Sequence, residues 1–233
     1  MKPPRRSLAE LINTDEPGID LVREWAAGAA TPVELLPVER AAGERALERL
    51  QITSRSPMGA IALETGGVWF DHGWIRLLGG GCERMPHDIA TFNFGDDFYG
   101  NGRHRLPGHV VFGWDLLGGF FALKAPDGMQ PASVCYFAPD TLRWQDLGFG
   151  FSAFVAHVCS GAMAGFYGDD RWPGHERDSA GVAGDRAFSI APPPFAKGPP
   201  VGERSRRAVP VEELWSLYVE DLGPQLADEG HAS

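Results

Sequence analysis

The middle of the chain alternates short apolar segments with glycine-containing turns, and this alternation restricts the possible folds more than any other feature. The segments are rich in β-branched and aromatic residues, as strands are, and they read GAIALET, GVWFDHG, WIRLLG, HVVFGWDLL, GFFALK and SVCYFA. The turn Glu64-Thr65-Gly66-Gly67 suits a β-hairpin, because glycine adopts positive φ without steric cost. No helix of about ten residues fits between most of the segments, as parallel strands would require. The pattern therefore predicts a mainly antiparallel sheet.

Helical patterns lie on both sides of this predicted sheet. Ser7 and Glu10 fit a capping box, in which both side chains bond backbone N–H groups at a helix start, and Pro37 suits the first turn of a later helix. In FSAFVAHVCSG apolar residues recur at helical spacing and predict one core-facing side. We therefore predict a single α+β domain over residues 1–233, with N-terminal and C-terminal helices packed on the sheet. Its parts are a helical N-terminal part at 1–56, the sheet at 57–147, a helical part at 148–188, a Pro-rich loop at 189–203 and a C-terminal helix at 204–222.

Charge and cysteine content argue against several classes of function. The formal net charge is −10, which disfavours sequence-independent binding to nucleic acid or to an anionic membrane surface. Cys82, Cys135 and Cys159 contain no CxxC pair and favour a reduced cytoplasm over a disulfide framework. The start MKPPRRSLAELIN lacks the apolar core of a signal peptide, and no run of about eighteen apolar residues could span a membrane. We expect a cytoplasmic protein without a nucleic-acid or membrane partner, and the oligomeric state is left open.

The strongest acid–base pair in the sequence is Asp71-His72. An aspartate can fix the tautomer of an imidazole, and a histidine can shuttle protons near neutral pH. With Arg76, and with Asp115 on a later strand, this pair forms the candidate catalytic set. Adjacent residues of an extended strand point to opposite faces, however. The alternative is that Asp71-His72-Gly73 is the turn that joins two antiparallel strands.

Gly148 and Gly150 begin the segment GFGFSA, which matches the G-x-G-x-x-A fingerprint of dinucleotide sites. Such a site needs the first glycine to end a buried parallel strand, so that the pyrophosphate meets the N-terminus of the next helix. The preceding TLRWQDL is too charged for such a strand, and no βαβ unit follows. The two glycines are therefore weak candidates for cofactor binding. The alternative is a glycine-rich entry into a core helix.

No motif for metal, phosphate or nucleophilic chemistry is found. The histidines are scattered, without H-E-x-x-H or a Cys/His cluster at ligand spacing, and no G-x-S-x-G elbow presents a serine. The glycines at 79–81 lack the Lys-Ser/Thr of a P-loop. His104 and His109 share a polar loop with Asp96 and Asp97, for which disorder or a specificity role is favoured over a metal site. We expect no metal and no cofactor.

Several segments of the sequence together resemble one bacterial family. They read RSPMGAIALETGG, DHGWIRLLGGG, GGFFALK, YFAPDTLRWQDLGFGFSAFVAHVCSG, FYGDDRWPG and RSRRAVPVEELW. From about Leu8 to Leu217 they resemble the family known as domain of unknown function 2625, a resemblance that implies no particular activity or catalytic residue. YFAPDT and LGFGFSAFVAHVCSG also resemble the closing strand and helix of the SMI1/KNR4-like (SUKH) superfamily. Members of that superfamily are α+β proteins, many of which are immunity proteins that neutralise toxins, so this resemblance implies a protein partner.

Three functional hypotheses follow. The first is a non-enzymatic protein that binds another protein, for example as an immunity-like factor, because an acidic surface steers basic partners. The second is an enzyme of unassigned class that uses Asp71, His72 and Arg76, together with Asp115. It requires these side chains to converge on a cleft with shifted pKa values. The third is a small-ligand binder at the turn Gly148–Ala153, and it requires Gly148 to end a parallel strand.

Overall fold

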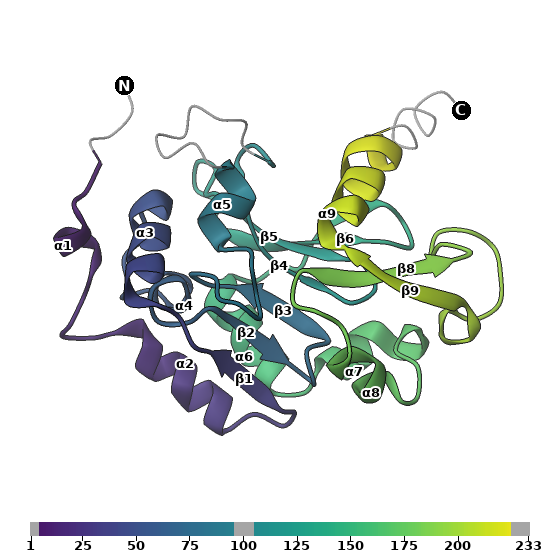
Figure 1. Cartoon of the computed structure of the whole chain (residues 1–233). Helices are drawn as coiled ribbons and strands as arrows, with labels where there is room; N and C mark the ends of the chain where they lie inside the picture. The colour runs from purple at the N-terminus through teal and green to yellow at the C-terminus, as the bar shows by residue number, and fades with distance from the viewer. Residues whose placement is uncertain (1–4, 96–104, 225–233) are drawn as a thin grey trace.

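Seven strands form one antiparallel sheet whose spatial order equals their order in the chain (Figure 1). In this computed structural model residues 5–95 and 105–224 are described. Each strand pairs with the next in antiparallel register. The predicted α+β class, the mainly antiparallel sheet and the single domain are thereby confirmed. The strands are β1 (Val33–Leu36), β2 (Gly67–Phe70), β3 (Ile75–Leu78), β4 (His109–Asp115), β5 (Phe120–Lys124), β6 (Ser133–Ala138) and β7 (Arg143–Asp146).

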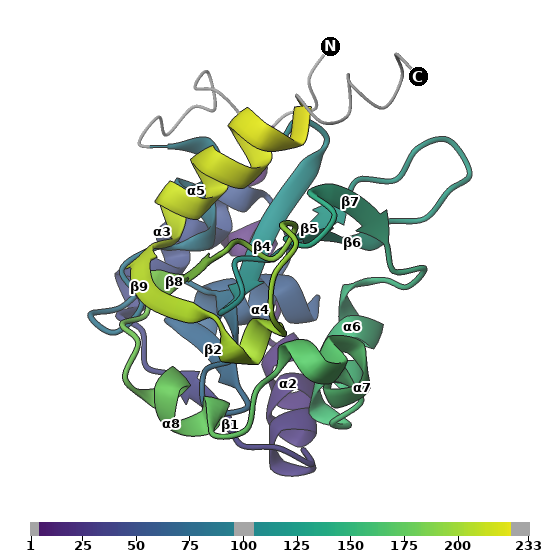
Figure 2. The same cartoon turned by 90° about the vertical axis from the view of Figure 1, so that its right-hand side faces the viewer.

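Helices cover one face of the sheet, and a second hairpin with the C-terminal helix covers the other (Figure 2). Phe121 of β5 packs on Phe154 of the helical face, whereas its neighbour Phe120 packs on Trp215 of the opposite layer. This is the side-chain alternation expected of a strand buried on both faces. The first layer contains α2 (Gly18–Ala27), α4 (Pro57–Glu64) and α6 (Phe151–Cys159), and the second contains β8 (Arg186–Ala191), β9 (Ser205–Pro210), α9 (Val211–Leu214) and a π-helical segment, η3 (Trp215–Leu222).

The remaining elements connect these layers or lie at their margins. The capping box predicted at Ser7 and Glu10 is present at the start of the first helix. The core-facing helix predicted in FSAFVAHVCSG is also present, as α6. The remaining elements are α1 (Leu8–Leu11), α3 (Arg40–Leu50), α5 (Ile89–Phe94), α7 (Met163–Tyr167), η1 (Gly168–Asp170), α8 (His175–Ala180) and η2 (Val201–Glu203).

The segment GAIALET, predicted as a strand, is helical and forms most of α4. Ser56 caps this helix by accepting the backbone N–H of Gly59, and Pro57 occupies its first turn, as such residues do at helix starts. All residues from Met58 to Leu63 are buried, so the helix has no polar face and no visible helical period. The predicted hairpin turn at Glu64–Gly67 is therefore wrong, since it joins a helix to a strand.

Three other boundaries differ from the prediction. The helical part at 1–56 contains the edge strand β1, and its third helix begins at Arg40 rather than at Pro37. β8 and β9 form a hairpin that overlaps the start of the predicted Pro-rich loop at 189–203 and the start of the predicted C-terminal helix at 204–222, whose end at Leu222 is as predicted. Helix starts only at Val211, after Pro210, whose preceding residue is biased towards extended backbone.

Candidate functional site

The segment Asp71-His72-Gly73 forms the turn between β2 and β3. All three residues have positive φ, of 50°, 58° and 83°, which places Asp71 and His72 in a conformation that aspartate and histidine tolerate better than most residues. The Asp71 side chain turns inward and the residue is buried, whereas His72 lines a shallow surface hollow. No hydrogen bond joins the two side chains within the described chain. Asp71 and His72 are adjacent in the sequence, but the turn directs their side chains to different places, so they do not act as an acid–base pair.

Asp71 instead contacts two residues about one hundred positions away. Its Oδ2 lies 2.7 Å from Nη1 of Arg171 and 3.2 Å from Nε2 of His175. The other ring nitrogen of His175 lies 3.2 Å from the carbonyl oxygen of Trp172, and the ring packs edge-on against Trp74 at 5.3 Å. We call Asp71, Arg171 and His175 the closed network, because each of these side chains has a partner inside the protein. Neither Arg171 nor His175 was identified from the sequence.

Arg76 is fully buried on β3 and bonds only to backbone carbonyl groups. Its guanidinium donates to Gly73 at 3.0 Å, to Val182 at 2.8 Å, to Arg186 at 3.1 Å and also to Ala183. Burial lowers the pKa of this group to about 9, so it stays charged at neutral pH. Three of these carbonyl groups belong to the segment 182–186, which Arg76 thereby holds against the sheet, and the fourth belongs to the turn before β3. All three nitrogens of the guanidinium are thus bonded to backbone inside the protein.

Asp115, at the end of β4, is also fully buried. Its Oδ1 accepts the backbone N–H groups of Leu117 and Gly119 at 2.9 Å each, and its Oδ2 accepts the hydroxyls of Tyr136 at 2.7 Å and Tyr167 at 3.0 Å. Burial raises the pKa of Asp115, and the four hydrogen bonds oppose that rise. Burial raises the pKa of both tyrosines well above their usual value. This carboxylate therefore holds the β4–β5 turn to β6 and α7.

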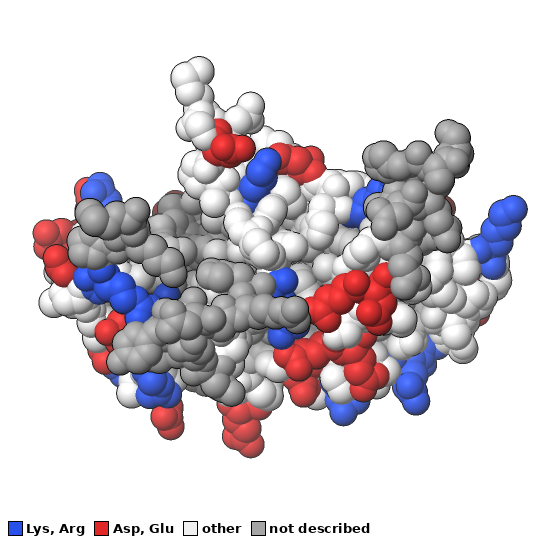
Figure 3. Space-filling model, turned by 90° about the horizontal axis from the view of Figure 1, so that it is seen from above, with Lys and Arg blue, Asp and Glu red and all other residues white. Residues whose placement is uncertain are grey.

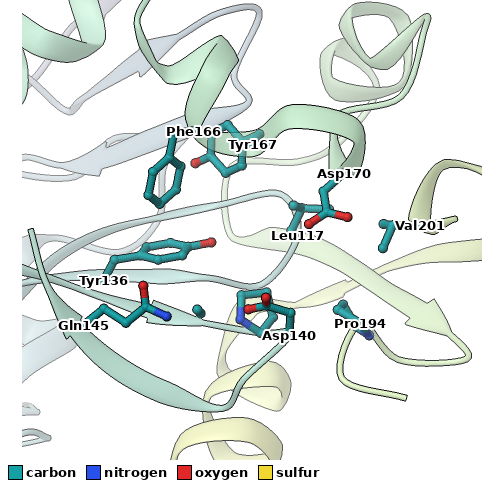
Figure 4. Close-up of a pocket in the computed structure, with 11 residues that line it drawn as sticks. Leu117, Tyr136, Asp140, Gln145, Phe166, Tyr167, Asp170, Pro194 and Val201 are labelled. Carbon is teal, nitrogen blue, oxygen red and sulfur yellow. The ribbon is translucent and has the colours of Figure 1, made fainter. Parts of the chain in front are cut away.

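A pocket of about 140 Å³ lies outside these tyrosines, between α7 and η1 on one side and the β6–β7 turn on the other (Figure 4). Tyr136 and Tyr167 line it, and Phe166 of α7 adds an exposed ring. Asp140 and Asp170 approach the space from opposite walls. Neither carboxylate has a hydrogen-bond or ion-pair partner among the described residues. We call this site the open pocket. Sequence reasoning did not find it.

The glycines of GFGFSA do not follow a parallel strand. β7, which precedes Gly148, pairs antiparallel with β6 at the edge of the sheet. Gly150 is the residue before the first turn of α6, and Phe151 is buried. The condition for the ligand-binding hypothesis at Gly148–Ala153 is not met, because a pyrophosphate site needs the carboxyl end of a parallel strand. The glycine-rich entry into a core helix is the arrangement observed.

Metal-ligand and thiol chemistry have no assembled site in the described ranges. Residues 5–95 and 105–224 contain no group of three His, Cys, Asp or Glu side chains that could hold a metal ion. His109 begins β4, whereas Asp96, Asp97 and His104 lie outside the described residues. Cys159 is buried, and burial raises its thiol pKa to about 11, so it is protonated at neutral pH.

The model of the family described as "Protein of unknown function DUF2625" matches residues 8–214. The chain belongs to the DUF2625 family. It is 34% identical over 213 residues to the uncharacterized protein YbfG of Escherichia coli (strain K12), covering 91% of this chain and 95% of that one. It is 28% identical over 188 residues to an uncharacterized protein of Haemophilus influenzae, covering 80% and 82%. No solved structure matches the chain, so the resemblance to the SUKH superfamily stays a prediction.

The DUF2625 match includes both the closed network and the open pocket, and it ends at the last residue of α9. Beyond it, η3 continues the C-terminal helix. Among residues 5–95 and 105–224, none of the helices combines the length and the apolar content needed to cross a bilayer.

The C-terminal helix formed by α9 and η3 has a buried apolar side and an exposed acidic side. Leu214, Trp215 and Tyr218 are buried in the core. The acidic residues of the helix are all exposed, and they are Glu212, Glu213, Glu220 and Asp221. Seen from above, acidic side chains form a contiguous patch at the position of this helix (Figure 3). We call it the acidic helix face.

Proposed function

We propose that this DUF2625 protein is a non-enzymatic, cytoplasmic protein that binds a basic protein partner through its acidic helix face. The observation that carries the proposal is the combination of exposed acidic residues with Leu217, a large apolar side chain that is 45% exposed in their midst. Apolar contact area surrounded by charge of one sign is typical of a surface that recognises a partner of opposite charge.

Two of the four acids on this helix are free to bind a partner. Glu212 pairs with Arg105 at 2.9 Å, and Glu220 accepts hydrogen bonds from the Trp215 indole and the Ser216 hydroxyl. Glu213 and Asp221 have no such partner among the described residues. A basic protein would therefore gain ion pairs with these two carboxylates without breaking existing ones. The net charge of −10 adds long-range attraction.

The state of the candidate catalytic residues favours a binding protein over an enzyme. Asp71, Arg76 and Asp115 direct their charged atoms to internal partners, and His72 stands apart from them at the surface of the turn. A general acid–base set needs its groups within hydrogen-bond reach of one substrate. The free thiols of Cys82, Cys135 and Cys159 suit a reducing compartment. An immunity-like role, neutralising a basic toxin, is the specific form of the proposal that the SUKH resemblance implies.

The test compares two variants of the full-length protein that carry the same change in charge. In Glu213→Lys/Asp221→Lys the acidic helix face is reversed. In Asp15→Lys/Glu24→Lys two exposed acids near the N-terminus are reversed instead. Each tagged variant and the wild type are isolated from the protein's own host after chemical cross-linking, and cross-linked partners are identified by mass spectrometry. The partner is then purified, and its affinity is measured at two salt concentrations.

We expect one basic protein that binds the wild type and the N-terminal variant equally. Its affinity for the helix variant should be at least about tenfold weaker, and its affinity for the wild type should fall as salt rises. A partner that binds both variants alike, or the recovery of no stoichiometric partner, would contradict the proposal.

A further inference from the structure

We propose that the open pocket binds a small organic cation, namely a free ammonium or guanidinium compound of about five to seven heavy atoms in total. This site is separate from the acidic helix face and goes beyond the protein-binding function. Its walls come from five parts of the chain: the β4–β5 turn, β6 with the turn after it, β7, the α7–η1 region and the segment between β8 and β9 (Figure 4).

The first reason is unpaired negative charge on facing walls. Asp170 descends from η1 and Asp140 rises from the β6–β7 turn towards the same space. The positive charge of Arg204 acts on Asp170, but the guanidinium of Arg204 donates its hydrogen bonds to the carbonyl groups of Pro192, Pro193 and Pro199. Arg204 therefore partly offsets the negative charge of Asp170 but forms no ion pair with it. Carboxylates that face each other across a half-enclosed space favour a cationic ligand when, as among the described residues here, no basic side chain pairs with either of them.

The electrostatics of Asp170 agree with this geometry. Burial raises the pKa of Asp170, the negative charges of Asp140 and Asp169 raise it further, and Arg204 lowers it. A bound cation would remove the repulsion between the two wall carboxylates. It would also give the Asp170 carboxylate a polar partner in place of the hydration that is lost on burial.

The remaining walls suit a cation as well. The Phe166 ring is 40% exposed and lies 5.0 Å from that of Tyr136, so aromatic surface is available for cation–π contact. The Tyr136 hydroxyl donates its only hydrogen to Oδ2 of Asp115. Its oxygen can therefore only accept a further hydrogen bond, which an ammonium donates and an anion cannot.

The size of the pocket sets the size of the ligand. Its volume of about 140 Å³ is close to that of protein cavities that hold benzene. Butylammonium and methylguanidinium have comparable or smaller bulk. Larger amines would extend through the opening into solvent.

The experiment titrates the full-length protein with butylammonium chloride and with methylguanidinium chloride. Butanol and sodium butyrate serve as neutral and anionic probes of similar shape. Binding is followed by chemical-shift changes in two-dimensional NMR of labelled protein. Asp140→Asn and Asp170→Asn remove one wall charge each with little change in shape. Asp127→Asn is the matched control, because this aspartate of the β5–β6 loop is exposed and does not line the pocket.

We expect saturable binding of the two cations, with shifts confined to residues around the open pocket, and no saturable binding of butanol or butyrate. Each wall variant should weaken the cation affinity by about tenfold, the effect of losing one charged hydrogen-bond partner. The control should stay within about twofold of the wild type, because an exposed charge outside the pocket is largely screened. Thermal unfolding of each variant shows whether the fold is retained.

Three results would overturn the assignment. The first is no saturable binding of either cation, and the second is equal binding of the neutral probe or of the wall variants. The third is that N-acetyl-lysine methylamide, which mimics a lysine within a protein, binds more tightly than butylammonium. In that case the pocket would serve a partner's side chain. The helix variant Glu213→Lys/Asp221→Lys should bind the cations like the wild type, so the two proposals can fail independently.

Discussion

The closed network and the open pocket lie beside each other in the chain but use their charges in opposite ways. Asp170 and Arg171 are consecutive residues, yet Arg171 turns to Asp71 at 2.7 Å, while Asp170 faces the open pocket without a partner. In the closed network every charged group meets one of opposite sign. In the open pocket two like charges meet. Charges that are paired and buried fix the fold, whereas unpaired charges on an accessible wall are available to a ligand.

The same contrast exists across a single layer of tyrosines. Asp115 lies behind Tyr136 and Tyr167 and accepts four hydrogen bonds. Asp140 lies in front of them and accepts none from the described residues. We therefore predict that aspartates on opposite sides of the same tyrosines differ greatly in their contribution to stability.

The largest effect is expected for Asp115→Ala. This change leaves two tyrosine hydroxyls and two backbone N–H groups without an acceptor in a fully buried site. We expect the free energy of unfolding to fall by about 3–5 kcal/mol, as measured by urea denaturation. Asp140→Ala is the matched change in front of the tyrosines, and it should alter stability by no more than about 0.5 kcal/mol. Similar losses in both variants would show that the buried and the exposed aspartate contribute equally to stability.

A second contrast uses two arginines that both lie over the ring of Trp69. The guanidinium carbons of Arg76 and Arg84 are 4.7 Å and 4.6 Å from the ring centre, but Arg76 is fully buried and Arg84 pairs with Glu34 at the surface. Arg76→Met leaves several buried carbonyl groups without donors, so we expect a loss of about 3 kcal/mol. Arg84→Met should lose less than about 1 kcal/mol. Thermal and urea unfolding of the two variants measure the difference.

Asp71→Asn tests whether the closed network is stabilised by charge. Asparagine tolerates the positive φ of 50° at this position, so the change removes the carboxylate charge without adding backbone strain. We expect a loss of about 2 kcal/mol, because Arg171 would keep its charge in a half-buried site without its counter-ion. A double-mutant cycle with Arg171→Met isolates the pair. A coupling energy near zero would show that the contact adds nothing to stability.

Much of the sheet could be predicted from the sequence, because its turns are local. Glycine-containing turns and the absence of room for crossover helices indicate an antiparallel sheet, and strands β2 to β6 follow the predicted segments. Helix α4 was missed because it is buried on all sides, so its apolar residues show no helical period. The cap at Ser56 and the proline at position 57 were the signals that could have identified it.

The candidate sites depend on contacts that the sequence does not contain. The turn at Asp71 could be predicted from its own residues, but its partner His175 is 104 positions away. The open pocket likewise joins Asp140 after β6 to Asp170 after α7, and nothing local in FYGDDRW distinguishes Asp170 from an exposed acid. Only the structure shows that the adjacent Arg171 pairs with Asp71 and not with Asp170.

The smallest effect, and the most specific, is expected for Asp170→Asn. Burial and neighbouring acids raise the pKa of Asp170 in the folded protein, so ionising this group opposes folding. That penalty is absent below the ordinary aspartate pKa of about 4, where the group is protonated in both states. It grows as pH rises from the ordinary pKa to the raised pKa of the folded state and is complete above the latter. Asp170→Asn should therefore match the wild type near pH 3 and exceed its stability at pH 7 by up to about 0.5 kcal/mol, since the group is partly exposed. Urea denaturation across this pH range measures the difference. The same substitution at Asp71 is expected to destabilise the protein. Opposite signs from one chemical change would therefore distinguish the closed network from the open pocket. A loss of stability in both variants would show that the Asp170 carboxylate has a stabilising partner.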